Sequence, residues 1–127
     1  MNTNKPINTN SQYKYDIYPR IFKFVVAVIG LSKLIPRAEE NKVIISQLLR
    51  SVTSMGANAN EADGVSTKND FIHCFTIVRK ETKETIYWLL LLSELNSQLK
   101  ERITILIKEG NEVVAIVSKI ISNSRNK

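Results

Sequence analysis

This 127-residue sequence contains few glycines, prolines, cysteines and histidines. Their scarcity argues against a disulfide scaffold, a turn-rich β fold and a zinc protein. Glycine occurs four times and proline three times, which disfavours a fold built from many tight turns. The single cysteine, Cys74, leaves no internal disulfide, and with one histidine, His73, it is too little for a zinc site. No apolar run approaches the roughly 18–20 residues that span a bilayer, so we expect no membrane helix.

Side chains arranged for catalysis are also missing. His73 and Cys74 are neighbours, and successive residues of a helix diverge by about 100°, so the two cannot form a catalytic dyad. No glycine-rich phosphate-binding loop occurs. We expect Cys74 to be buried as a small apolar residue and His73 to lie on the surface. The sequence therefore favours a protein that is not an enzyme and uses no metal or cofactor.

Length and composition indicate one soluble domain, with 43% apolar and 24% charged residues. The polar N-terminus lacks the apolar centre of a signal peptide, and together with the single cysteine this predicts a cytoplasmic protein. We divide the chain into a polar N-terminal tail (1–14), a folded domain (15–122) and a basic C-terminal tail (123–127).

The net charge of +6 is unevenly distributed. Residues 1–15 and residues 122–127 each carry +2, so the remainder of the chain carries only +2. A basic isoelectric point is often a matter of solubility, and the charge of one chain alone is weak support for an anionic partner.

Four segments share apolar residues spaced alternately three and four apart, the pattern of helices packed in a bundle. In the first two segments these residues are Ile17, Ile21, Phe24, Val28, Leu31 and Ile35, then Ile45, Leu48, Val52, Met55, Ala59 and Ala62. In the last two they are Phe71, Phe75, Val78, Thr82, Thr85, Leu89 and Leu92, then Leu99, Ile103, Leu106, Gly110, Val113, Val117 and Ile120. With short links between them, they predict an all-α, antiparallel up-down-up-down four-helix bundle.

Helix ends can be assigned from the connecting residues. Pro36 stops the first helix, and Gly64 is expected to close the second in a left-handed conformation. Ser66 or Thr67 is expected to cap the third helix, and Thr67 with Asp70 three residues later resembles a capping box. Asn96 lies at the break before the fourth. Gly110 falls on the seam of the fourth helix, where it either marks a kink or admits a neighbouring helix; the unchanged spacing favours a continuous helix.

The segment from Ile86 to Leu92 is apolar on every side of its helix, more than one bundle core can bury. The side chains left on its outer side predict a subunit interface, and a second outer stripe on the first helix predicts a partner surface. The candidate interface residues are Tyr87, Trp88, Leu91 and Leu95, with Phe22, Val26 and Ile29 on the first helix.

Two stretches, QLLRSVTSMGANANEA at 47–62 and RKETKETIYWLLLL at 79–92, resemble signatures of a bacterial four-helix-bundle family. Its members are often called ribosomal RNA intervening-sequence proteins, and the resemblance extends from about Tyr15 to Ile121. The chain departs from the first signature at Leu49, Ala59 and Asn60 and in the position of Gly64.

The resemblance implies a homopentamer of four-helix subunits. One branch of the family comprises accessory proteins of diversity-generating retroelements, and for that branch it implies basic rings that bind nucleic acid and a reverse transcriptase. Five copies of a chain with a charge of +6 would carry +30, which strengthens the argument for an anionic partner.

Two groups of polar residues are candidates for a site. The candidate phosphate-binding residues are Arg20, Lys23, Arg79, Lys80 and Lys83, for which a solvated charged face is an equally good interpretation. A second group on one flank of the second helix comprises Arg50, Ser54, Asn58 and Glu61. It is either a partner-binding strip or, as we favour, a network between helices in which Arg50 pairs with Glu81 or Glu84.

The sequence thus supports two hypotheses. The first is a non-enzymatic oligomer that binds RNA or DNA with little sequence specificity. The second is a protein–protein scaffold or adaptor whose positive charge is incidental.

Overall fold

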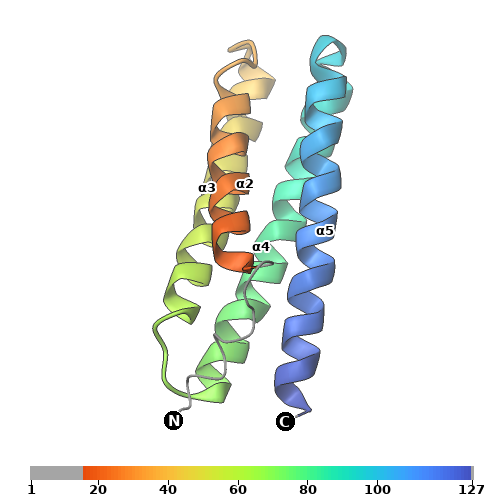
Figure 1. The fold of residues 1–127 in the computed structure, drawn as a ribbon. Helices are drawn as coiled ribbons and strands as arrows, with labels where there is room; N and C mark the ends of the chain where they lie inside the picture. Colours follow the sequence, from red (N-terminus) through yellow and green to blue (C-terminus); the bar gives the residue numbers. More distant parts are fainter. Residues whose placement is uncertain (1–15, 127) are drawn as a thin grey trace.

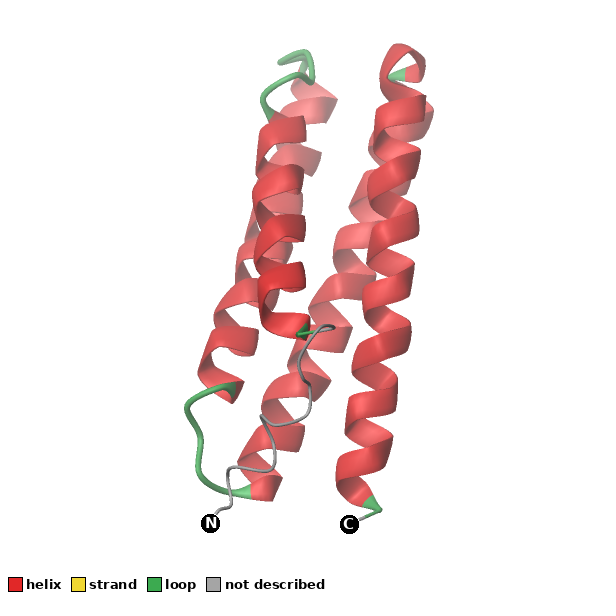
Figure 2. Ribbon diagram, in the orientation of Figure 1, coloured by secondary structure: helices red, strands yellow, loops and turns green. Residues whose placement is uncertain are grey.

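The computed structural model describes residues 16–126, and in that range it contains four long helices, a single turn of 3-10 helix and no strand. The long helices are α2 (Ile17–Ser32), α3 (Glu39–Ala62), α4 (Lys68–Leu95) and α5 (Lys100–Arg125), with η1 at Ser97–Leu99. They lie side by side along one axis, joined by short loops (Figures 1 and 2). The all-α prediction is confirmed. The predicted N-terminal tail, 1–14, falls outside the described residues.

The predicted seams of α2, α3 and α4 are all buried, including the polar Thr82 and Thr85. In α5 the predicted Ile103, Gly110, Val113 and Val117 are buried, whereas Ile121 is buried in place of Ile120, which is only partly so. Leu99 and Leu106 are likewise only partly buried. An α-helix advances 3.6 residues per turn, so a strict three–four alternation drifts slowly away from the core.

The helix ends agree with the sequence prediction at two places. The Thr67 side chain accepts a hydrogen bond of 3.1 Å from the Asp70 amide, and α4 ends at Leu95 with Asn96 as its cap. Gly64 does not take the left-handed conformation we expected. The chain leaves α3 instead through a tight turn, in which the Gly64 amide donates to the Glu61 carbonyl at 2.9 Å.

The last helix runs farther than the sequence division allowed. It continues to Arg125, so most of the predicted C-terminal tail at 123–127 is helical. It also passes through Gly110 without a break. A Cβ atom at that position would lie 2.9 Å from Cγ1 of Ile86 and 3.3 Å from Cζ of Phe24. The absence of a side chain at Gly110 is therefore what allows α4 and α2 to approach α5 so closely.

Polar pairs join α3 to α4 inside the bundle. The hydroxyl groups of Ser51 and Thr85 are 2.8 Å apart, and Asn41 and Asn96 exchange two side-chain hydrogen bonds of 2.9 and 3.0 Å. All four residues are buried. Because a buried polar group without a partner is costly, these pairs fix one register between the two helices.

Candidate functional site

Basic side chains gather where α4 lies against the second half of α5. Arg79 bridges the two helices, because its Nη1 donates a hydrogen bond of 3.2 Å to Oγ of Ser118. Lys80 and Lys83 follow on α4, and both are exposed. None of these three basic side chains forms an ion pair within residues 16–126. We call this surface the basic face. It consists of Arg79, Lys80 and Lys83 on α4 together with Lys119 and Arg125 on α5.

The basic face extends onto α5 through two residues that the sequence analysis did not select. Lys119 follows Ser118 and is exposed. Arg125 lies seven residues after Ser118, two helical turns farther along the same side of α5. We had assigned Arg125 to a tail. The sequence does carry a signal for it, since an apolar residue at Ile121 continues the helical spacing almost to the end of the chain.

Arg20 is not part of this surface. Its Nε and Nη2 donate hydrogen bonds of 2.6 and 2.8 Å to the Glu109 carboxylate, and Nη2 also contacts Glu112 at 2.5 Å. These hydrogen bonds raise the pKa of Arg20 and lower the pKa of Glu109. Two carboxylates thus offset its charge, and Arg20 serves to join α2 to α5. The predicted role of Arg20 in phosphate binding has to be corrected.

Lys23 is exposed on α2, separate from the basic face. Helix α2 packs along α3 and α5, and it meets α4, where Arg79, Lys80 and Lys83 lie, only through core side chains such as Tyr18 and Phe75. The cations that we grouped from the sequence therefore do not form one surface.

The polar network predicted between helices centres on Arg50. Its Nη2 donates to Oε2 of Glu84, and its Nη1 lies 3.5 Å from Oε1 of Glu81. The Trp88 indole N–H donates to the same Glu84 oxygen at 3.2 Å. Asn58 and Glu61 do not join this network. Asn58 donates within α3, to the Ser54 carbonyl, and Glu61 is exposed.

Negative charge is in excess at this network. Glu81 is only 7% exposed, and its Oε1 has no hydrogen-bond partner among residues 16–126. One guanidinium group, that of Arg50, faces the two carboxylates of Glu81 and Glu84. The cluster therefore carries a net charge of −1 when all three groups are ionised, and it opens to solvent beside Glu84.

The predicted apolar interface on α4 is divided between exposed and half-buried side chains. Tyr87 and Leu95 are 54% and 53% exposed, whereas Trp88 and Leu91 pack partly against the core. Trp88 is drawn inward by its hydrogen bond to Glu84. Leu90, which is not among the predicted interface residues, is 49% exposed. The apolar surface is thus present, with Leu90 in addition to the residues predicted.

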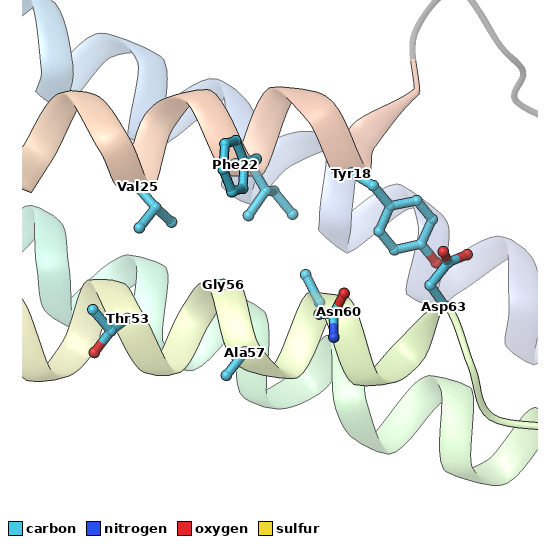
Figure 3. Close-up of a pocket in the computed structure, with 10 residues that line it drawn as sticks. Tyr18, Phe22, Val25, Thr53, Gly56, Ala57, Asn60 and Asp63 are labelled. Atoms are coloured by element: carbon cyan, nitrogen blue, oxygen red, sulfur yellow. The ribbon is translucent and has the colours of Figure 1, made fainter.

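On α2, Phe22 and Val26 are 70% and 53% exposed, and Ile29 is partly buried. Beside Phe22 a groove of about 390 Å³ separates α2 from α3, with Val25 on one wall and Gly56 and Ala57 on the other (Figure 3). Tyr18 closes one end of it, next to Asp63. This groove could not be predicted from the sequence, because it forms between two helices.

Two candidates for other chemistry can be placed. His73 is exposed, and Cys74 is buried, which raises the pKa of its thiol. Residues 16–126 contain no group of three His, Cys, Asp or Glu side chains able to hold a metal ion. No helix within that range is both long and apolar enough to cross a membrane.

Comparison with known proteins relates the chain to a sequence family and to a solved structure. Residues 13–119 match the family described as 23S rRNA-intervening sequence protein. The fold is similar to the crystal structure of a protein of unknown function from the S23 ribosomal protein family of Bacteroides thetaiotaomicron. The TM-score is 0.75 and the identity 31%, over 83% of this chain and 97% of that one. Among curated proteins, none matches the sequence.

Proposed function

The chain belongs to the 23S rRNA-intervening sequence protein family, and we propose that it is a non-enzymatic oligomer that binds RNA or DNA through the basic face. The observation that carries this proposal is the position of Arg79, Lys80 and Lys83. They lie on one surface, together with Lys119 and Arg125, and form no ion pair within the described range.

Each subunit in this proposal is an antiparallel up-down-up-down bundle. Contacts between helices support that topology, because a higher residue number on one helix pairs with a lower number on the next. Asn41 pairs with Asn96, whereas Arg50, farther along α3, pairs with Glu84. The same holds between α4 and α5, where Arg79 contacts Ser118 and Ile86 faces Gly110.

Binding would be directed at phosphate groups. Arg79 and Lys83 lie four residues apart, so their side chains leave α4 on the same side about one turn apart. Arg79 is already held in place by Ser118, which reduces the side-chain entropy lost when it contacts an anion. Contacts of this kind release counterions and read no base, so we expect affinity that falls steeply with salt and discriminates little between sequences.

Assembly would multiply this surface. We propose a cytoplasmic homopentamer, the form implied by the family resemblance, in which each copy contributes one basic face. The exposed apolar side chains on α2 and α4 support self-association, since large exposed apolar patches on soluble proteins generally mark contact surfaces. A reverse transcriptase, also implied by the resemblance, remains a proposed partner.

The second candidate function is a protein–protein scaffold or adaptor with incidental charge. The same exposed apolar residues favour it, and it needs no basic face. The two functions differ in their response to salt and to loss of the α4 cations.

Fluorescence anisotropy with a labelled single-stranded RNA and a labelled DNA duplex, each at several salt concentrations, tests the proposal. The Lys80→Ala/Lys83→Ala variant should bind more weakly to both. For duplex DNA, its slope of log affinity against log salt should fall by about 2. Lys42→Ala/Arg102→Ala is the matched control that also removes two cations, because Lys42 is exposed on α3 and Arg102 is exposed about 160° around α5 from Ser118. Binding that ignores salt would favour the scaffold, and equal losses in the two variants would overturn the role of the basic face.

A further inference from the structure

We infer that an apolar strip on α4 of one copy packs against a strip on α2 of a second copy, and that Lys23 of that copy approaches the Glu81–Glu84 carboxylates. The inference rests on the proposed assembly and goes beyond it, because it names the two surfaces in contact and the charge that joins them. The α4 strip consists of Glu84, Trp88, Leu91 and Leu95, and the α2 strip of Phe22, Val26 and Ile29.

The two strips have matching spacing. On α4 the residues follow one another by four, three and four positions, and on α2 by four and three. Residues spaced in this way lie along one side of a helix, and two such stripes can interdigitate along their length. The α4 strip presents Leu95 at 53% exposure, and the α2 strip presents Phe22 and Val26 at 70% and 53%.

The fold prevents these strips from meeting within one subunit. Helix α2 packs along α3 and α5, and α4 packs along the same two helices, so α2 and α4 occupy opposite corners of the bundle and meet only through their core side chains. Their outer surfaces therefore point away from each other. A contact between an α4 strip and an α2 strip must join different copies, and repeating it adds subunits head to tail until a ring closes.

Charge determines which ends of the strips meet. The acidic cluster lies at the N-terminal end of the α4 strip, where one Arg50 faces both Glu81 and Glu84. Oε1 of Glu81 is buried and lacks a hydrogen-bond partner. Oε2 of Glu84 already accepts hydrogen bonds from Arg50 and Trp88, which leaves Oε1 for a new donor on the open side.

Lys23 supplies the complementary charge at the corresponding end of the α2 strip. It is exposed, lies three residues before Val26 and therefore beside the strip, and forms no ion pair within residues 16–126. With α2 and α4 parallel, Phe22 and Lys23 lie opposite Glu84, while Val26 and Ile29 lie opposite Trp88 and Leu91. A lysine there would bring the local charge from −1 to zero.

Shape supports the same pairing. The groove beside Phe22 makes this part of the α2 side concave, and its walls are largely apolar (Figure 3). Tyr87 projects from α4 next to the α4 strip and is 54% exposed. Its ring packs edge-on against that of Trp88, with 5.0 Å between the ring centroids. Aromatic side chains that fill an apolar pocket are typical anchors of protein interfaces.

Blocking one surface at a time tests the pairing by sedimentation velocity on the full chain. Phe22→Asp disables the α2 strip, and Leu95→Asp disables the α4 strip. Ile105→Asp is the control, because Ile105 is 67% exposed on α5 and belongs to neither strip. All three positions are largely exposed, so circular dichroism should show intact helices. We expect the control to assemble as the unaltered protein does and each blocked variant to be a monomer.

Mixing the two blocked variants gives the decisive result. Each retains one intact surface, so an equimolar mixture should form a dimer and nothing larger. A mixture that stays monomeric, or a Phe22→Asp variant that assembles fully, would overturn the inference while leaving the proposed assembly standing. A monomeric unaltered protein would overturn both.

The charge contact has its own test. Lys23→Glu should weaken assembly at least about tenfold at low salt, whereas Lys23→Arg should preserve it. Lys42→Glu makes the same change of charge at an exposed lysine of α3 outside both strips. Equal effects of Lys23→Glu and Lys42→Glu would show that net charge, and not this contact, governs assembly, and would overturn the role given to Lys23.

Discussion

Replacing Gly110 with alanine tests whether close packing or helix propensity dominates where α2, α4 and α5 meet. Replacing a helical glycine with alanine ordinarily stabilises a protein, since alanine is favoured in helices by about 1 kcal/mol. At Gly110 the added Cβ would lie 2.9 Å from Cγ1 and 3.2 Å from Cδ1 of Ile86. Contacts under 3 Å require the surrounding side chains to move.

The neighbours of Gly110 cannot move easily. Cγ1 is bonded directly to the β-branched carbon of Ile86, whose χ1 is stiff in a helix. On the other side, Cζ of Phe24 would be 3.3 Å away, and Phe24 is 2% exposed. Forcing a methyl group into a well-packed core costs about 1–3 kcal/mol, which exceeds or offsets the gain in propensity. We therefore expect Gly110→Ala to lower the free energy of unfolding by about 0–2 kcal/mol.

Gly30→Ala is the matched control. Gly30 also lies inside a helix, and a Cβ added there would have nothing within 4 Å. This variant should gain about 0.4–1 kcal/mol. Urea unfolding followed by circular dichroism, at one protein concentration so that assembly contributes equally, measures both. The gap between the two variants, about 1–3 kcal/mol, is the packing strain at Gly110.

A double-mutant cycle identifies the source of the strain. In an Ile86→Ala background the clashing atoms are gone, and Gly110→Ala should then be neutral or stabilising. If Gly110→Ala stabilises the unaltered protein as much as Gly30→Ala does, the argument that the missing side chain permits the close approach of α4 is refuted.

Three further predictions concern polar contacts. Arg50→Ala should destabilise the fold by about 1–3 kcal/mol in urea, because it leaves Glu81 as a buried carboxylate without a counter-charge; Glu81→Gln in that background should restore part of the loss, and no restoration would contradict this account. Because the pKa of Glu109 is lowered in the folded protein, its contribution to the free energy of unfolding is complete above the ordinary glutamate pKa of about 4.3. That contribution disappears as the pH falls through the lower pKa of the folded state. The difference in unfolding free energy between the unaltered protein and Glu109→Gln, about 0.5 kcal/mol at pH 7, should therefore shrink on acidification; a constant difference would dismiss the ion pair. Thr67→Ala should cost about 1 kcal/mol through loss of the α4 cap and Thr67→Ser almost nothing, so similar thermal midpoints for the two variants would show that the cap is unimportant.

The polar candidates show where sequence reasoning reaches its limit. Arg50 and Glu84 could be paired from their positions, because both helices have a recognisable seam and the two residues flank it. Arg20 could not be distinguished from a free cation. Its partners, Glu109 and Glu112, are about 90 residues away, and only the packing of α2 on α5 brings them within hydrogen-bonding distance.

The exposure of the apolar residues on α4 could likewise be predicted only in part. The run from Ile86 to Leu92 necessarily places apolar groups on the outside, whatever the neighbours are. Which of them remain exposed depends on local contacts: the hydrogen bond from Trp88 to Glu84 draws the indole toward the bundle, while Leu90 stays open to solvent.

The sequence by itself determined the number of helices, most of their buried sides and the region where α4 begins, because these depend on spacing and on interactions between residues close in the chain. The tertiary structure decided which charges are offset and which remain available, where the basic face lies, and how the groove beside Phe22 forms. Those properties depend on pairs of residues from different helices, and a linear pattern does not record the distance between them.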